Sequence, residues 1–155
     1  MIFPEGITAR LRALLGVEDH AETAEHALRR AIATLLVRAL TVDGTETIEE
    51  TMKLVDLLEA RFGLSDQETA ELVTEAKTAE RDAVDLFAFT NTVTQHLDRD
   101  GRIGVLEMMF EVVAADGVVD VFEENLISRA ATLLRVPDYY QQTMRPRLFA
   151  SMAGR

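Results

Sequence analysis

The chain has 155 residues, of which 48% are hydrophobic and 28% charged, a balance typical of one compact domain. Its formal net charge of −11 argues against a nucleic-acid-binding surface, which needs Lys and Arg to release counterions from phosphate. The absence of cysteine excludes disulfides, thiol nucleophiles and thiolate zinc sites.

Apolar residues recur at helical spacing along the whole chain. Only three prolines occur, and Val, Ile and Thr nowhere settle into the alternation of a half-buried strand. We therefore expect an all-α fold, a compact bundle of about seven to eight helices joined by short loops. The expected helices cover residues 5–15 within an amphipathic N-terminal segment (1–18), then 21–43, 48–62, 65–79, 82–97, 100–116, 121–135 and 137–150.

Cap and turn residues define several of these helix ends. Ser65 followed by Glu68 is a capping-box pattern, and Pro137 suits the first position of the last helix. The segment 100–116 is apolar on nearly every side, which makes it the candidate for a buried central helix.

An internal repeat is the most informative feature of the sequence. Residues 35–64 and 108–136 both read as an apolar helix, an Asp-Gly pair and a second, amphipathic helix. The simplest packing of two such hairpins is about a pseudo-twofold axis. The matched positions are Asp43 with Asp116, Gly44 with Gly117, Thr47 with Asp120, and Glu50 with Glu123.

The aspartates of the two Asp-Gly pairs need an explanation. Each lies near a helix C-terminus, where the helix dipole disfavours a negative charge by about 0.3–1 kcal/mol. One alternative is local, with each carboxylate accepting backbone N–H groups of its own turn, while Thr47–Glu50 and Asp120–Glu123 act as capping boxes. The other is a bound divalent cation (Ca²⁺, Mg²⁺, Mn²⁺ or Zn²⁺), with Glu50 or Glu123 brought close by the turn.

Residues 96–107 imitate the spacing of an EF-hand calcium loop. The first ligand position, however, is His96, and the residues after Gly101 continue as helix. We therefore interpret this segment as a helix junction, with Asp98 or Asp100 near the N-terminal end of a helix.

The sequence resembles the TerB family of tellurite-resistance proteins over about residues 25–140. The resemblance rests on the paired Asp-Gly segments VDGTETIEE and ADGVVDVFE, with RFGLSDQE and DLFAFT between them. The length of the chain fits a single domain over 1–155. The resemblance implies that this domain is all-α, that it is associated with stress response and membrane-linked protein complexes, and that its acidic turns bind divalent metal. The residues that it implies as metal ligands are Asp43, Glu50, Asp116, Asp120 and Glu123. The first turn departs from the family pattern, because Glu46 replaces an aliphatic residue and Thr47 replaces the aspartate.

No constellation of catalytic residues is present, so we expect no enzyme. The histidines His20, His26 and His96 are scattered, and no glycine-rich loop could hold phosphate. The N-terminus lacks a basic leader and no apolar run approaches the ~20 residues of a membrane span, which favours a soluble, cytoplasmic protein. Two functions remain, a metal-responsive regulatory or scaffold domain and a metal-independent acidic module for a basic or membrane-associated protein partner.

Overall fold

The computed structural model describes residues 23–153, and every regular element in that range is helical. The all-α prediction is therefore confirmed for this part of the chain. The expected helix at 5–15 and the segment 1–18 lie outside the described residues.

Helix α2 (Ala24–Thr41) is the centre of the bundle. Its N-cap is Thr23, whose hydroxyl accepts the N–H of His26 at 3.1 Å. The helix packs against α3, α4, α5 and α6, and it is buried along an almost continuous run from Ala31 to Leu40. A helix that is apolar on nearly all sides belongs in a core, and α2 takes that place.

Helices α3 (Ile48–Phe62) and α4 (Asp66–Asp82) follow, with the expected capping residues between them. Gly63 ends α3 in the left-handed conformation, at φ 63°, which costs a residue without Cβ very little. The predicted capping box between Ser65 and Glu68 is present in both directions.

Helices α5 (Phe87–His96) and α6 (Arg99–Val113) begin and end at different residues from those expected. Helix α5 starts at Phe87 rather than near residue 82, because Ala83 is extended and Asp85 accepts the N–H of Phe87 at 2.9 Å. The EF-hand-like segment is a helix start, as predicted, with Asp98 accepting the N–H of Gly101 at 2.9 Å. Burial of α6 is confined to its second half, from Val105 onward, so α2 rather than α6 is the central helix.

The C-terminal part comprises α7 (Val121–Leu133), α8 (Pro137–Tyr139), the π-helical segment η1 (Tyr140–Met144) and α9 (Arg145–Ala153). Pro137 occupies the predicted first position of α8. The wider π turn comes directly before Pro146, whose ring would clash with a carbonyl one α-helical turn earlier and which lacks an N–H to donate. The single helix expected at 137–150 is thus divided by this turn.

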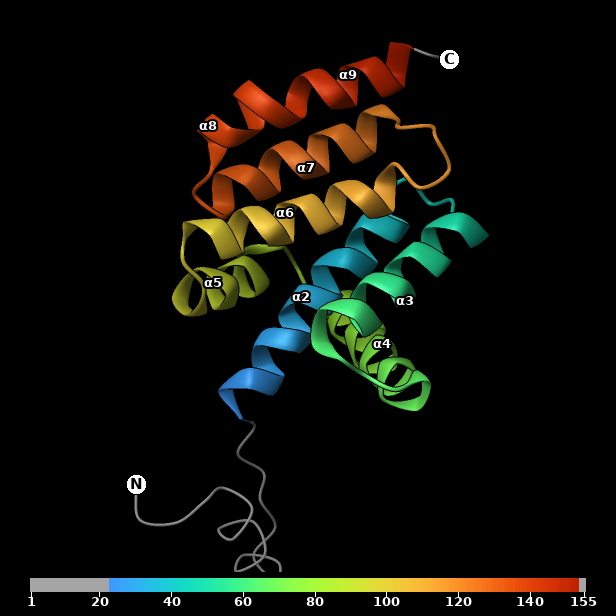
Figure 1. The fold of residues 1–155 in the computed structure, drawn as a ribbon, viewed down its shortest axis with the longest axis vertical. Coiled ribbons are helices and arrows are strands. Elements are labelled where there is room, and N and C mark those ends of the chain that lie inside the picture. The colour runs from blue at the N-terminus through green and yellow to red at the C-terminus, as the bar shows by residue number, and fades with distance from the viewer. Residues whose placement is uncertain (1–22, 154–155) are drawn as a thin grey trace, which may run out of the picture.

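The two Asp-Gly turns lie at the same edge of the molecule. In Figure 1 the connection from α2 to α3 and the connection from α6 to α7 both lie at the right, while α5 lies at the left. Gly44 and Gly117 adopt the same left-handed conformation, at φ 76° and 82°. The two units therefore match in their local turn geometry, and their relation by a pseudo-twofold axis stays a prediction.

Candidate metal centre

Each Asp-Gly turn is closed by its own aspartate. Oδ1 of Asp43 accepts the N–H of Thr45 at 2.9 Å, and Oδ1 of Asp116 accepts the N–H of Val118 at 3.0 Å. These are the local hydrogen bonds expected of an aspartate in a turn. They account for one oxygen of each carboxylate and leave open what the other oxygen does.

The helices that follow the turns are capped in two different ways. Asp120 and Glu123 form a full capping box, in which the Glu123 N–H reaches Asp120 at 2.8 Å and the Asp120 N–H reaches Glu123 at 3.0 Å. In the first unit the Thr47 hydroxyl accepts the Glu50 N–H at 3.1 Å and donates to Glu50 Oε1 at 2.9 Å. Glu50 therefore contacts the hydroxyl instead of the backbone N–H that a full box would use.

The carboxylates of the two units converge on one place. Carboxylate oxygens of Asp43, Asp120 and Glu123 all lie within 4.8 Å of one another. Two oxygen ligands on opposite sides of a Ca²⁺ ion are separated by up to about 5 Å, so this spacing fits a single cation. Across residues 23–153 no other set of three such side chains comes together in this way.

This grouping crosses the repeat. The matched spacing of the sequence suggested one ligand set per turn, with Asp43 beside Glu50 and Asp116 beside Glu123. Instead, Asp43 from the end of α2 meets the side chains at the start of α7. Glu50 lies within the electrostatic influence of Asp43, Asp116 and Glu123, so all five predicted residues belong to one acidic centre.

Two glutamates of this centre are almost completely buried. Glu50 is 1% exposed and Glu123 is 2% exposed. Burial is the main cause that raises the pKa of Glu50 from 4.5 to about 7 and that of Glu123 from 4.5 to about 8. Burial also raises the pKa of Asp120, with a further contribution from Asp43. Ionising both glutamates would hold charges of the same sign together out of water, and the raised pKa values reflect that cost.

One oxygen in the centre has no donor. Oε2 of Glu50 is buried and accepts no hydrogen bond, and a hydrogen bond between Glu50 and Glu123 requires a proton on one of the two carboxyls. The neighbouring lysines are engaged elsewhere, Lys77 with Glu46 at 3.9 Å and Lys53 with Glu111 at 3.6 Å. A buried carboxylate oxygen without a donor is costly, and a divalent cation is the group that this donor set fits.

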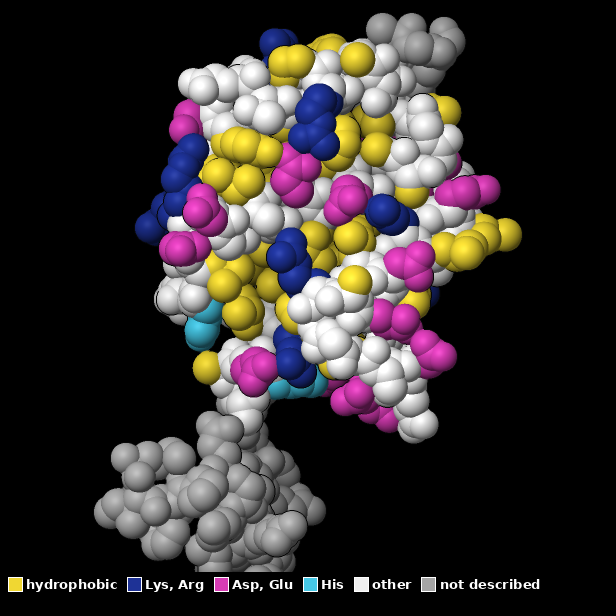
Figure 2. Space-filling model, viewed as in Figure 1, with side chains coloured by type: hydrophobic (Ala, Val, Ile, Leu, Met, Phe, Trp, Pro, Cys, Tyr) yellow, Lys and Arg dark blue, Asp and Glu magenta, His cyan; other side chains and the backbone are white. Residues whose placement is uncertain are grey.

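Of the five residues selected from the sequence, the structure brings Asp43, Asp120 and Glu123 together, and Glu50 is influenced by the charges of Asp43 and Asp116. That any of the five binds a metal stays a prediction, and their mutual arrangement was not predicted. The sequence signal that bears on this arrangement is the identical spacing from Asp to Glu in both copies, because it allows the aspartate of one turn to meet the glutamate of the other. Figure 2 shows acidic side chains along the right side of the molecule, over α3 and α4.

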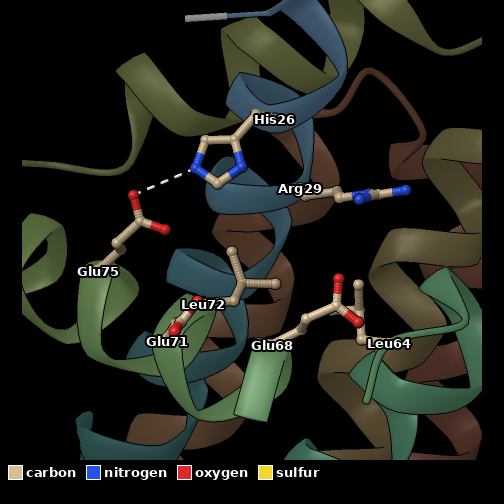
Figure 3. Close-up of a pocket in the computed structure, with 7 residues that line it drawn as sticks. All are labelled: His26, Arg29, Leu64, Glu68, Glu71, Leu72 and Glu75. Carbon is tan, nitrogen blue, oxygen red and sulfur yellow. Dashed lines mark hydrogen bonds and ion pairs between the residues drawn. The ribbon is translucent and has the colours of Figure 1, made fainter. Parts of the chain in front are cut away.

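A polar hollow lies between α2 and α4, away from the acidic centre (Figure 3). It has a volume of about 130 Å³, and Nε2 of His26 lies 3.1 Å from Oε1 of Glu75 across it. Glu68, on the other side of the hollow, is committed to the Ser65 cap, which lowers its pKa. The carboxylates that line this hollow do not converge as those of Asp43, Asp120 and Glu123 do.

None of the helices between residues 23 and 153 is long and apolar enough to cross a bilayer. Comparison with known proteins gives a match to a family model described as Tellurite resistance protein TerB, over residues 29–145. The matched range contains both Asp-Gly turns and all five acidic residues. No curated protein and no solved structure matches the chain.

Proposed function

The chain belongs to the TerB family of tellurite-resistance proteins, and we propose that it is a non-catalytic stress-response domain whose two Asp-Gly turns together bind one divalent cation. In this proposal the ligands are Asp43, Asp120 and Glu123, with Glu50 and Asp116 completing the negative charge around them. The bound cation makes the domain a regulatory or scaffold module.

The observation that carries the proposal is the buried, unpartnered oxygen of Glu50. Caps and turns alone would explain Asp43, Asp116 and the Asp120–Glu123 box, each of which has a backbone donor. They do not explain why a second glutamate is buried against the first with one oxygen lacking any donor. A cation bound by Asp43, Asp120 and Glu123 would offset this cost, because its positive charge neutralises the negative charge that the two glutamates share.

The position of the centre suggests how a cation would act on the fold. Asp43 follows α2, whereas Asp120 and Glu123 begin α7, so the ligands join two helix pairs that are separate in sequence. A cation held by both pairs would stabilise the arrangement in which their turns lie together. Anything that binds the folded state alone adds RT ln(1 + [L]/Kd) to its stability, so the effect depends on metal concentration.

Metal-dependent unfolding of the full chain tests the proposal. Melting temperatures are measured in EDTA and then with millimolar Ca²⁺, Mg²⁺, Mn²⁺ or Zn²⁺, and at least one ion is expected to raise the melting temperature of the wild type. Asp43→Asn should lose this rise while keeping the turn, because its amide oxygen can still accept the Thr45 N–H. Glu49→Gln is the matched control, since Glu49 is an exposed neighbour of Glu50. A rise of equal size in Asp43→Asn, or none in the wild type, contradicts the proposal.

A metal-independent interaction module is the second candidate. Its support is the charge of the two turn segments, because residues 43–52 and 116–125 each contain four acidic residues and no Lys or Arg. A partner held by this charge would be released by salt but not by EDTA. Retention that disappears in EDTA at constant ionic strength would favour the metal-dependent function instead.

A further inference from the structure

Most of the large apolar side chains that the described structure exposes lie beside the acidic centre. We call this set the apolar collar; its members are Ile48, Met52, Val118, Val121 and Phe122. Ile48 is 74% exposed and Phe122 is 59% exposed. Scattered apolar residues on a surface need no explanation, but a group at one place marks a site of contact.

The acidic centre brings the two halves of the collar together. Ile48 is the first residue of α3, directly after its N-cap Thr47, and Val121 is the first residue of α7, directly after its N-cap Asp120. Because Asp43 meets Asp120 and Glu123, the starts of these two helices lie at one edge of the molecule. Both copies of the repeat therefore expose an apolar side chain at the same helical position.

These side chains contribute little to the core. Ile48 and Met52 project from the first half of α3, Val121 and Phe122 from the first turn of α7, and Val118 from the turn that precedes α7. Figure 2 shows hydrophobic side chains protruding at the right edge of the molecule, over the start of α3, with acidic side chains next to them. Glu46 and Glu49 lie beside Ile48 in the sequence, and Asp116 lies two residues before Val118, so carboxylates adjoin the collar; we call these three residues the acidic rim.

The rim charges are exposed and unbalanced. Glu46, Glu49 and Asp116 are all exposed. The only cation paired with one of these three among the described ion pairs is Lys77, at 3.9 Å from Glu46. Such a rim attracts positive charge at long range and repels negative charge.

The sign of this charge decides among the possible occupants. A second copy of the chain would bring an identical acidic rim against the first, and anionic lipid or nucleic acid would be repelled in the same way. We propose that the apolar collar docks a cationic amphipathic segment of a partner protein. Its apolar residues cover Ile48, Val121 and Phe122, and its Lys or Arg side chains face Glu46, Glu49 and Asp116.

This inference names the partner class for the interaction module and does not rest on cation binding. The buried glutamates Glu50 and Glu123 take no part in it, since the rim consists of exposed carboxylates. Docking and metal binding can therefore fail separately, and measuring docking in both EDTA and Ca²⁺ keeps the two results distinguishable.

Fluorescence anisotropy with labelled synthetic peptides tests the proposal on the full chain. One probe is an amphipathic helical peptide of leucine and lysine, and the control probe has glutamate in place of each lysine. The lysine peptide is expected to bind the wild type in EDTA, with an affinity that falls as salt is raised. Equal binding of the glutamate peptide would overturn the proposal, because it would show apolar adhesion without charge selection.

Substitutions locate the binding surface. The double variant Ile48→Ser, Phe122→Ser should weaken binding of the lysine peptide by about tenfold or more, the effect of removing anchoring side chains. Phe87→Ser is the matched control, because Phe87 is 59% exposed like Phe122 but begins α5 at the opposite side of the molecule. Circular dichroism confirms that all variants fold. An equal loss in Phe87→Ser, or no loss in the double variant, contradicts the proposal.

Other occupants would give results of their own. A sedimentation experiment in which the wild type forms a dimer and the double variant a monomer would assign the collar to contact between copies. Cosedimentation of the wild type, but not the double variant, with phosphatidylserine vesicles would assign it to a membrane. Either result overturns docking of a cationic protein segment.

Discussion

Replacing Glu50 with glutamine should make the metal-free protein more stable at high pH. The pKa of Glu50 is raised from 4.5 to about 7, so the folded state binds its proton more tightly than the unfolded state does. Stability from this group is therefore full below pH 4.5 and is lost as the pH rises to about 7. Each pKa unit corresponds to about 1.4 kcal/mol, so the ionised carboxylate destabilises the fold by roughly 3 kcal/mol at pH 9.

The Glu50→Gln variant removes this ionisation with little change in shape. Part of the gain is offset, because the Thr47 hydroxyl exchanges a charged acceptor for a neutral one, a loss of about 1 kcal/mol. We expect Glu50→Gln to raise the free energy of unfolding by about 2 kcal/mol at pH 9, and the melting temperature by roughly 4–8 °C. At pH 5 the two proteins should differ by less than about 1 kcal/mol.

Urea unfolding followed by circular dichroism in EDTA, at pH 5 and pH 9, measures this difference. Glu49→Gln controls for the loss of one negative charge at the same helix start, and its effect should stay within about 0.5 kcal/mol at both pH values. The argument that ionised Glu50 destabilises the fold would be refuted in two cases. In one, Glu50→Gln is less stable than the wild type at pH 9; in the other, the substitution changes stability equally at both pH values.

The remaining predictions concern the second glutamate, the first turn and two glycines. Because the pKa of Glu123 is raised to about 8, the metal-free wild type should lose stability between pH 5 and pH 9, and Glu123→Gln should lose less. If urea unfolding gives the two proteins the same dependence of stability on pH, the prediction is contradicted. Thr47→Asp adds a carboxylate at the position where the second unit has Asp120, so titration calorimetry should show that this variant binds Ca²⁺ more tightly than the wild type. The control variant Thr47→Ser should bind Ca²⁺ with the affinity of the wild type. Gly117→Ala should lower the free energy of unfolding by about 1 kcal/mol, because φ is 82° at this position. Gly104→Ala, inside α6, should raise the free energy of unfolding by up to about 1 kcal/mol. Unfolding curves that reverse this order would show that backbone conformation does not govern these two positions.

Local signals in the sequence predicted local structure well. The bounds of α3, the Ser65 capping box and Pro137 at the start of α8 all follow from residues within one helical turn of each feature. The start of α5 was predicted too early because the Asp85 side chain accepts the N–H of Phe87, and this local hydrogen bond competes with helix formation before Phe87. The division before α9 was missed because Pro146 can be accommodated by a wider turn as well as by a helix end.

The acidic centre shows where local reasoning ends. Spacing along the chain singled out the five acidic residues as candidates, since Asp-Gly turns and caps have short sequence patterns. It could not show that Asp43 meets Asp120 and Glu123 of the other unit, because that contact depends on how α2 packs beside α6 and how α6 packs beside α7. Burial of Glu50 and Glu123, and hence their raised pKa values, follows from the same packing.

The number of ions bound per chain tests the central claim most directly. Because the ligands of both turns converge, isothermal titration with the most stabilising of the four cations should give one site per chain at pH 8. Asp43→Asn and Asp120→Asn should each abolish that site, and the second variant should keep its fold, since an asparagine at that position can still cap α7. Two sites per chain, with Asp43→Asn removing only one of them, would contradict a centre shared by the two turns.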